Sequence, residues 1–151
     1  MIRGVSFNIP QKTSNILFQI LKCIKTENFH WYNIMSQTEV WDSSHCFDFF
    51  EDDYYDGEKF LNLIFLEHFV LFLKLQAYSN PDDFSELHTY EEFINSNCQL
   101  LLLIYDCEFV EIFIKDSLLS KVIYKNALLN GFTKVKYITE ENDSRVCMDV
   151  K

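Results

Sequence analysis

Glycine is scarce in this chain: there are 3 among 151 residues, and they stand far apart. Nucleotide-binding loops such as GxGxxG and GxxxxGK[ST] need several closely spaced glycines so that the backbone can approach a phosphate. The sequence therefore excludes a glycine-rich phosphate-binding loop. It also lacks a GxSxG elbow and any other family signature of nucleophilic catalysis. The absence of these catalytic motifs favours a protein that is not an enzyme.

Basic residues are also few, with 13 Lys and Arg against 23 Asp and Glu, for a net charge of -10. This excludes a nucleic-acid binder, which needs clustered cations to displace counterions. No basic amphipathic helix offers itself to a membrane surface, and the longest apolar run, residues 100–105, is too short to span a bilayer. The chain runs from Met1 straight into a strand pattern with no signal peptide. We expect a cytoplasmic protein.

The 5 cysteines form no CxxC pair and are expected to be reduced thiols. Neither the neighbours His45 and Cys46 nor any other pair has the spacing of a zinc site. The acidic run 51–57 resembles a calcium loop, but Tyr54 and Leu63 stand where carboxylate ligands are required. The sequence predicts no metal and no cofactor.

The hydrophobic pattern predicts one α+β domain over residues 1–151, with a mixed, largely antiparallel sheet and about four helices mostly on one face. The expected strands are residues 5–9, 29–35, 37–41, 68–78, 100–105, 110–114 and 132–138. The expected helices are residues 14–24, residues 57–64, a helix of two turns that starts after Thr89, and residues 117–130. A polar tail follows at 139–151, in which a last short strand can form at 145–150.

Local signals place the ends of these elements. Thr13 or Ser14 is suited to cap the first helix, Asp116 the last, and Thr89 with Glu92 forms a capping box. Cys107 is an awkward turn residue, so the connection between the strands at 100–105 and 110–114 should be slightly longer than a two-residue turn. The inward positions expected on the last helix are Leu118, Leu119, Val122, Ile123 and Ala127.

The most distinctive segment is the acidic window, residues 26–58, which has nine carboxylates, nine aromatic rings and no Lys or Arg. In one interpretation the rings are core and the acids are merely solvated. In the other, exposed rings among carboxylates bind a basic partner protein, as an immunity-type protein or an adaptor would. Lysines on the first and last helices provide an opposite pole, which allows a monomer or a weak homo-oligomer. The candidate partner-binding residues are Trp41, Asp42, Asp52, Asp53, Tyr54, Tyr55 and Asp56.

A rival hypothesis is a small enzyme or ligand binder whose pocket is lined by His, Cys and Asp side chains from separate strands. A deep pocket with converging polar groups would favour that hypothesis. A flat exposed patch of rings and carboxylates would favour partner binding.

Several short strings resemble a small family of uncharacterised bacterial proteins, mostly from Gram-positive spore-formers, known as a domain of unknown function. The strings are Arg3–Pro10, Trp31-Tyr32, Asp56-Gly57-Glu58, Leu75–Tyr78, Asn130-Gly131-Phe132, Tyr137–Thr139 and Asn142-Asp143. The resemblance covers nearly the whole chain. It implies a single-domain bacterial cytosolic protein and brings no activity, ligand or catalytic residue.

Overall fold

The computed structural model describes residues 1–10, 14–44 and 48–151. Its strands are β1 (Ile2–Asn8), β2 (His30–Asn33), β3 (Glu39–Asp42), β4 (Tyr54–Tyr55), β5 (His68–Tyr78), β6 (Cys98–Tyr105), β7 (Phe109–Ile114) and β8 (Thr133–Thr139). Its helices are α1 (Ile16–Leu21), α2 (Gly57–Ile64), α3 (Tyr90–Asn95), α4 (Ser117–Leu129) and the short 3-10 helices η1 (Thr26–Asn28), η2 (Met35–Gln37) and η3 (Pro81–Asp83). The predicted α+β class is confirmed.

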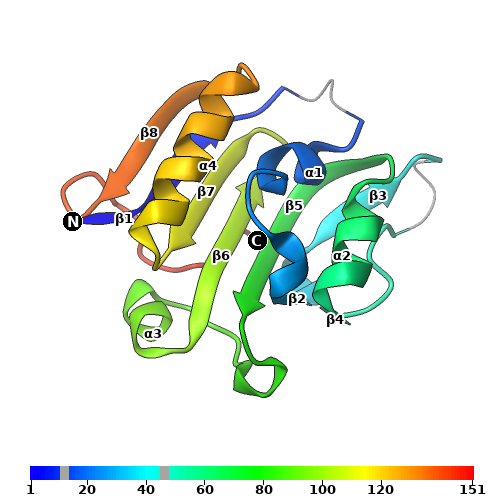
Figure 1. Ribbon diagram of the computed structural model, residues 1–151, viewed down its shortest axis with the longest axis horizontal. Coiled ribbons are helices and arrows are strands. Elements are labelled where there is room, and N and C mark those ends of the chain that lie inside the picture. The colour runs from blue at the N-terminus through cyan, green and yellow to red at the C-terminus, as the bar shows by residue number, and fades with distance from the viewer. Residues whose placement is uncertain (11–13, 45–47) are drawn as a thin grey trace.

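The strands form one open sheet in the order β4-β2-β5-β6-β7-β1-β8, and all pairings between the named strands are antiparallel. β5 is 11 residues long and pairs with β2 through residues 75–78 and with β3 through residues 68–72. β2 and β3 follow one another along the same edge of β5 (Figure 1). The acidic window therefore builds one end of the sheet, and β8 forms the other.

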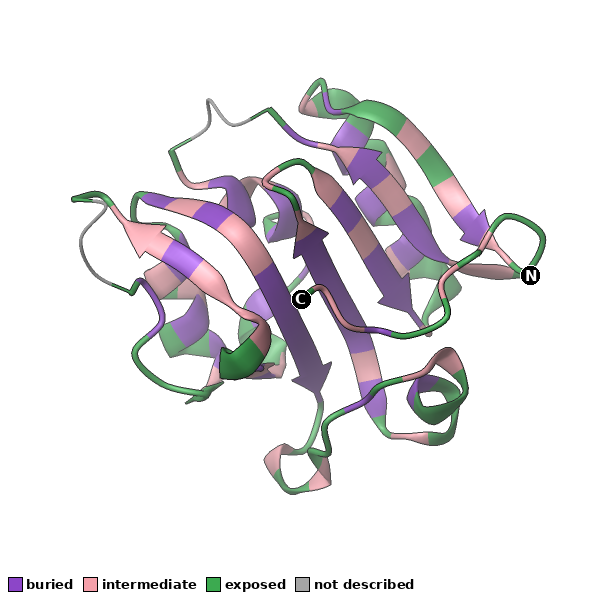
Figure 2. Ribbon diagram, turned by 180° about the vertical axis from the view of Figure 1, so that it is seen from behind, coloured by how far each residue is buried: buried purple, intermediate pink, exposed green. Residues whose placement is uncertain are grey.

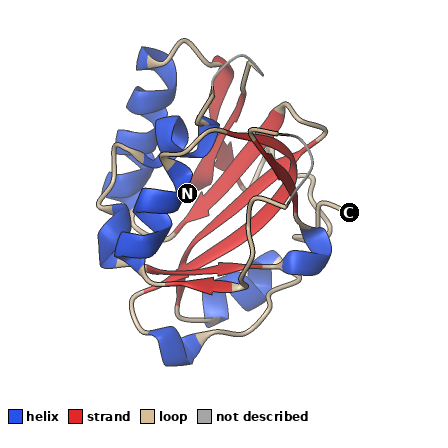
Figure 3. Cartoon of the chain, turned by 90° about the vertical axis from the view of Figure 1, so that its right-hand side faces the viewer, coloured by secondary structure: helices blue, strands red, loops and turns tan. Residues whose placement is uncertain are grey.

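Helices α1, α2 and α4 cover one face of the sheet, as Figure 3 shows from the side. Alternate residues of the strands point to this face, because successive side chains of a strand lie on opposite sides. Val5, Leu75, Leu102 and Ile112 belong to the large core cluster formed there. The prediction of helices mostly on one face is confirmed.

The opposite face of the sheet is covered by α3, η3 and the C-terminal strap, which is residues 140–151. Figure 2 shows the strap crossing the middle of this face. Met148 of the strap is buried in a second, smaller core cluster with Tyr78, Leu101 and Phe113. Its backbone N–H donates to the carbonyl of His88 at 2.7 Å. The strap contains no strand, in place of the short one expected at 145–150.

Ion pairs fasten the strap to the rest of the molecule. Arg3 Nη1 lies 2.9 Å from Asp143, Arg145 Nη2 lies 2.7 Å from Glu111, and Lys74 Nζ lies 2.9 Å from Asp149. Gln37 Oε1 also accepts a hydrogen bond from Val150 N at 2.7 Å. The strap therefore holds its place through polar contacts with distant residues, while it adds no strand to the sheet.

The start of α1 differs from expectation. The helix begins at Ile16 with Asn15 at the N-cap, so Ser14 is not the cap, and Thr13 lies outside the described residues. No side chain of the helix itself caps this end. Instead, Leu17 N donates to His68 Nε2 of β5 at 3.2 Å. A residue far along the chain thus satisfies an N–H group that a local cap usually satisfies.

The buried side of α4 also differs from expectation. Ile123 and Ala127 are buried as predicted, but Leu118 is 67% exposed and Val122 is 40% exposed. The helix turns Asn126 inward, and its side-chain amide donates to the carbonyl of Gln19 at 3.0 Å. Because the last carbonyls of a helix lack partners within it, this amide completes the C-terminal end of α1 and sets the rotation of α4.

The connection between β6 and β7 consists of residues 106–108, as the expected longer turn requires. Asp106 and Cys107 nevertheless have positive φ angles of 52° and 64°. Cys107 thus adopts a left-handed conformation that Gly, Asn and Asp adopt more readily than cysteine. Cys107 N donates to the carbonyl of Leu71 at 3.1 Å, a contact that helps hold the turn.

Candidate functional site

The seven predicted partner-binding residues fall in two places. Trp41 and Asp42 end β3, where they pair with Phe69 and His68 of β5. Residues 52–56 lie at the outer edge of the sheet, where β4 pairs with Trp31 and Tyr32 of β2. The structure therefore separates the first two candidates from the other five.

A groove of about 410 Å³ lies between edge strand β4 and helix α2, and we call it the edge groove. Four of the predicted residues line it, together with four residues of α2 and its C-terminal end. The lining residues are Asp52, Tyr54, Tyr55, Asp56, Lys59, Asn62, Leu63 and Leu66. The two leucines and the two tyrosines make its wall largely apolar, and Leu66 is 58% exposed there.

Local hydrogen bonds hold the carboxylate side of the groove in shape. Asp56 is the N-cap of α2 and accepts from Lys59 N at 2.9 Å. The Tyr55 hydroxyl accepts from the backbone N–H groups of Glu51 and Asp52, at 3.0 and 2.9 Å. Gly57 must be glycine, because a Cβ there would lie 2.2 Å from the carbonyl of Glu27. Asp56 and Tyr55 are thus partly structural, whereas Asp52 and Asp53 are exposed.

An exposed row of aromatic rings continues from the groove around the sheet edge. The ring centroid of Tyr54 lies 4.9 Å from that of Tyr32, which in turn stacks on Phe84 at 4.1 Å. The Tyr54 hydroxyl is 2.7 Å from Nδ1 of His30. Tyr54 and Phe84 are 36% and 38% exposed. We call Tyr32, Tyr54 and Phe84 the aromatic row.

Carboxylates flank the aromatic row on both sides. The pKa of Tyr32 lies above its ordinary value, first because its phenol is partly desolvated and then because Tyr54, Asp82 and Asp53 surround it. The pKa of Tyr54 is raised by desolvation and by Asp56. The rings are therefore neutral and lie in a field of negative charge.

The sequence missed several members of this surface. Tyr32 comes from β2 and Phe84 from the loop after η3, while Leu63 comes from α2 and Leu66 from just beyond its C-terminal end. Phe84 and Asp82 lie outside the acidic window, so only chain folding brings them to it. Conversely, Trp41 stacks on Phe69 at 6.1 Å, and Asp42 accepts two hydrogen bonds from Ser44, which gives both residues a local structural role.

The rival hypothesis required a pocket of His, Cys and Asp side chains. His68 is buried, with Nε2 accepting from Leu17 N and Nδ1 2.8 Å from the carbonyl of Leu66, so both ring nitrogens are engaged. Burial raises the pKa of the Cys98 thiol to about 11. A second pocket, on the strap face, is lined by Asp143 and Cys147 with no histidine among its described residues. His45 and Cys46 lie outside the described residues.

Residues 1–10, 14–44 and 48–151 contain neither a candidate metal cluster nor a candidate membrane-spanning helix. No group of three or more His, Cys, Asp or Glu side chains in this part of the chain is arranged to hold a metal ion. Among the same residues, no helix has the length and apolar character that crossing a bilayer requires.

Comparison with known proteins assigns the chain to a family. A family profile described as a protein of unknown function (DUF2691) matches residues 2–149. The chain belongs to the DUF2691 family. A relative in Bacillus subtilis (strain 168), the uncharacterised protein YncE, is 31% identical over 157 residues, covering 99% of this chain and 100% of the relative. No solved structure matches the chain.

Membership of DUF2691 confirms the resemblance seen in the sequence. The family has no described function, so it assigns no role to any residue of the edge groove or of the strap face. Function must be argued from the geometry of this chain.

Proposed function

We propose that this DUF2691 protein binds a basic, arginine-bearing segment of a partner protein at the edge groove and the aromatic row. The observation that carries the proposal is the aromatic row, in which Tyr32 stacks on Phe84 and contacts the tilted ring of Tyr54, with carboxylates near it. The activity is one of binding, of the immunity or adaptor type, and needs no catalytic group.

The chemistry of the surface matches such a segment. A guanidinium group stacks well on tyrosine and phenylalanine rings and pairs with carboxylates at the same time. The apolar wall of the edge groove suits the methylene stems and apolar side chains of the same segment. Edge position adds to this, because a strand at the edge of a sheet leaves backbone groups available for a further strand.

Charge supports the choice of a basic partner over a neutral one. Asp52 lines the groove, and both Asp52 and its neighbour Asp53 are exposed. Lys59, the cation among the described residues of its lining, lies 3.9 Å from Asp56, and its side chain is 79% exposed.

The test is a titration of the intact protein with three short peptides of equal length, rich in arginine, lysine or glutamate, followed by calorimetry and amide NMR shifts. We expect the arginine peptide to bind more tightly than the lysine peptide by roughly two- to fivefold, because only arginine stacks as a plane. Its binding should weaken as salt is raised, and the largest shifts should fall on β2, β4 and α2.

Two double variants, each of which removes two negative charges, distinguish binding at this surface from a general effect of net charge. Asp52→Asn with Asp53→Asn should weaken the arginine peptide about fivefold or more, without lowering the melting temperature, since like charges are relieved. Glu140→Gln with Glu141→Gln, beyond β8 at the other end of the sheet, should change the affinity little. Equal losses in the two variants, or an arginine peptide that does not bind, would refute the proposal.

A further inference from the structure

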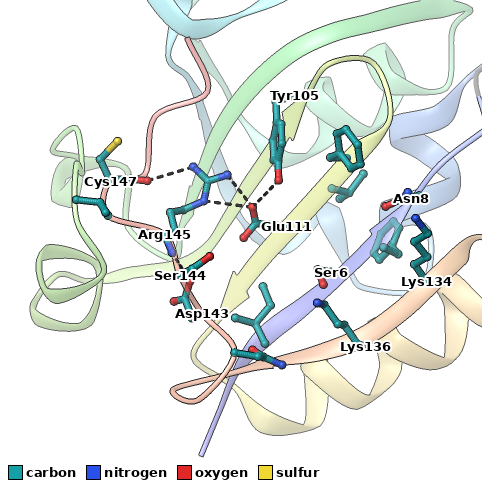
Figure 4. Close-up of a pocket in the computed structure, with 16 residues that line it drawn as sticks. Ser6, Asn8, Tyr105, Glu111, Lys134, Lys136, Asp143, Ser144, Arg145 and Cys147 are labelled. Atoms are coloured by element: carbon teal, nitrogen blue, oxygen red, sulfur yellow. Dashed lines mark hydrogen bonds and ion pairs between the residues drawn. The ribbon is translucent and has the colours of Figure 1, made fainter.

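A pocket of about 490 Å³ lies on the strap face, away from the edge groove. Its floor is formed by β1, β7 and β8, and its wall by residues 142–147 of the strap (Figure 4). Two of the ion pairs that fasten the strap, Arg3 with Asp143 and Arg145 with Glu111, hold this wall in place. The pocket is therefore complete only when the strap is in position.

Lys134 and Lys136 of β8 supply positive charge at one end of the pocket. Within the described residues, neither ammonium group has an ion pair or a hydrogen bond, although the cations nearby on the strap face, Arg3, Lys74 and Arg145, are all paired. Lys136 pairs with Ser6 across the strands, so their side chains lie on the same face. Figure 4 shows Lys134 and Lys136 on the side of the pocket where Ser6 and Asn8 lie.

Ser6 adds an unsatisfied hydroxyl to the same end. Its Oγ is buried, and it has no hydrogen-bond partner within the described residues. Buried polar atoms are nearly always paired, so an unpaired one beside the free ammonium group of Lys136 indicates a missing acceptor. An oxyanion supplies acceptors to this hydroxyl and to the two lysine ammonium groups at once.

The backbone of β8 is shaped around this end of the pocket. The pairing of β1 with β8 shifts register between Ser6 and Asn8, and Lys134 has a positive φ of 53°. Such bulges re-aim side chains at sheet edges and beside binding sites. Lysine has no intrinsic preference for this conformation, so the surrounding structure must impose it.

Glu111 of β7 presents an acceptor on the other side of Ser6 from Lys136, since Ser6 pairs with both residues across the strands. Glu111 takes hydrogen bonds from the Tyr105 hydroxyl at 3.1 Å and from Nη2 and Nε of Arg145 at 2.7 and 3.2 Å. All of these use Oε1, so Oε2 remains to accept from a ligand hydroxyl. The ring of Phe109, stacked on Tyr105 at 5.3 Å, adds an apolar side chain to the lining near Asn8, with which it pairs across the strands.

We propose that this pocket binds a small hydroxyl-bearing phosphate monoester. The phosphate lies between Lys134, Lys136 and the Ser6 hydroxyl, and a ligand hydroxyl donates to Glu111. Two ammonium groups match the charge of a phosphate dianion, which exceeds that of a single carboxylate. The volume suits a ligand of sugar-phosphate size.

The test uses the full chain and measures calorimetric affinity and amide NMR shifts for ribose 5-phosphate, inorganic phosphate and gluconate. We expect ribose 5-phosphate to bind most tightly and to shift the amides of β1 and β8. Gluconate has sugar hydroxyls but only a single carboxylate charge. Inorganic phosphate has the phosphate charge but no sugar hydroxyl to donate to Glu111. Either of them binding as tightly as ribose 5-phosphate would overturn the proposal, as would a failure of ribose 5-phosphate to bind.

Variants test the residues one group at a time. Lys134→Gln with Lys136→Gln should weaken ribose 5-phosphate about tenfold or more. Lys121→Gln with Lys125→Gln, the same charge change on the exposed side of α4, should leave the affinity nearly unchanged. Ser6→Ala should weaken binding roughly two- to tenfold while leaving the melting temperature of the free protein unlowered, because the hydroxyl has no protein partner to lose. Equal losses in the two lysine variants, or a Ser6→Ala protein that binds normally, would refute the site.

Discussion

His68 shows how one side chain can decide a local structure elsewhere in the chain. It caps the first turn of α1 through Leu17 N, and burial lowers its pKa from 6.5 to about 4. The neutral ring is what fits, because the acceptor nitrogen that meets Leu17 N must carry no proton. Protonation therefore favours the unfolded chain.

This gives a pH dependence with a definite sign. The folded pKa is below the unfolded one, so stability is fully present above about pH 6.5 and is lost as the pH falls toward about 4. Between about pH 7 and pH 5 the loss should be about 2 kcal/mol, measured by urea unfolding at each pH.

The control for this prediction is a pair of histidine variants. In His68→Gln the slope above pH 5 should disappear, although the variant is less stable throughout. In His30→Gln, at the half-buried sheet edge, the slope should stay. A His68→Gln protein with an unchanged slope would contradict the prediction.

At the scale of elements, α4 separates what hydrophobic periodicity can predict from what packing decides. Periodicity located the helix, its Asp116 cap and the positive φ of Gly131 after it, all of which depend on neighbours in sequence. It could not tell which of several apolar positions face the sheet. The side of α4 that faces the sheet is the one on which Asn126 donates to a carbonyl at the end of α1.

Two neighbouring truncations measure this rotation. Ile123→Ala should lower the free energy of unfolding by about 2–4 kcal/mol, because it empties a fully buried position. Val122→Ala should change it by less than about 0.5 kcal/mol, because Val122 faces water. Urea unfolding of both variants gives the comparison, and a larger loss for Val122→Ala would mean that α4 is rotated the other way.

At the scale of the whole molecule, the strap links the last residues of the chain to the middle of the sheet. Lys74 is fully buried, and its ammonium donates to the carbonyl of Leu87 and to Asp149. A buried charge without its partner is costly, so the strap compensates for a cation that the sheet could not otherwise hold.

The Lys74–Asp149 pair can be compared with an exposed pair on the same segment. Asp149→Asn should cost about 3 kcal/mol of unfolding free energy, because it leaves Lys74 buried with one partner fewer. Lys151→Gln breaks the ion pair between Lys151 and Glu39, whose side chains are 36% and 38% exposed respectively. Because the pair is exposed, this change should lower the free energy of unfolding by less than about 1 kcal/mol. The double variant Lys74→Met with Asp149→Asn should regain much of the first loss, and failure to do so would show that the strap is held by other contacts.

The candidate surfaces were only partly visible in the sequence. The acidic window was recognised because it is continuous, and four of its predicted residues do line the edge groove. Phe84 and Asp82 were missed because they come from another loop, and Trp41 was included although it pairs elsewhere. The strap pocket had no signal at all, since Ser6, Glu111, Lys136 and Arg145 are scattered over the length of the chain.

The sequence by itself determined the elements, because a strand or a helix depends on residues within a few positions of one another. Alternation marked β1 and β7, and the capping residues Thr89 and Asp116 marked two of the helix starts. Only the tertiary structure decided how α1 is capped, how α4 is rotated and where the strap lies. These features depend on hydrogen bonds and ion pairs between residues 34 to 140 positions apart, such as Leu17 with His68, Asn126 with Gln19 and Arg3 with Asp143. No periodicity in the sequence records such pairs, because they form only when the sheet brings the two segments together.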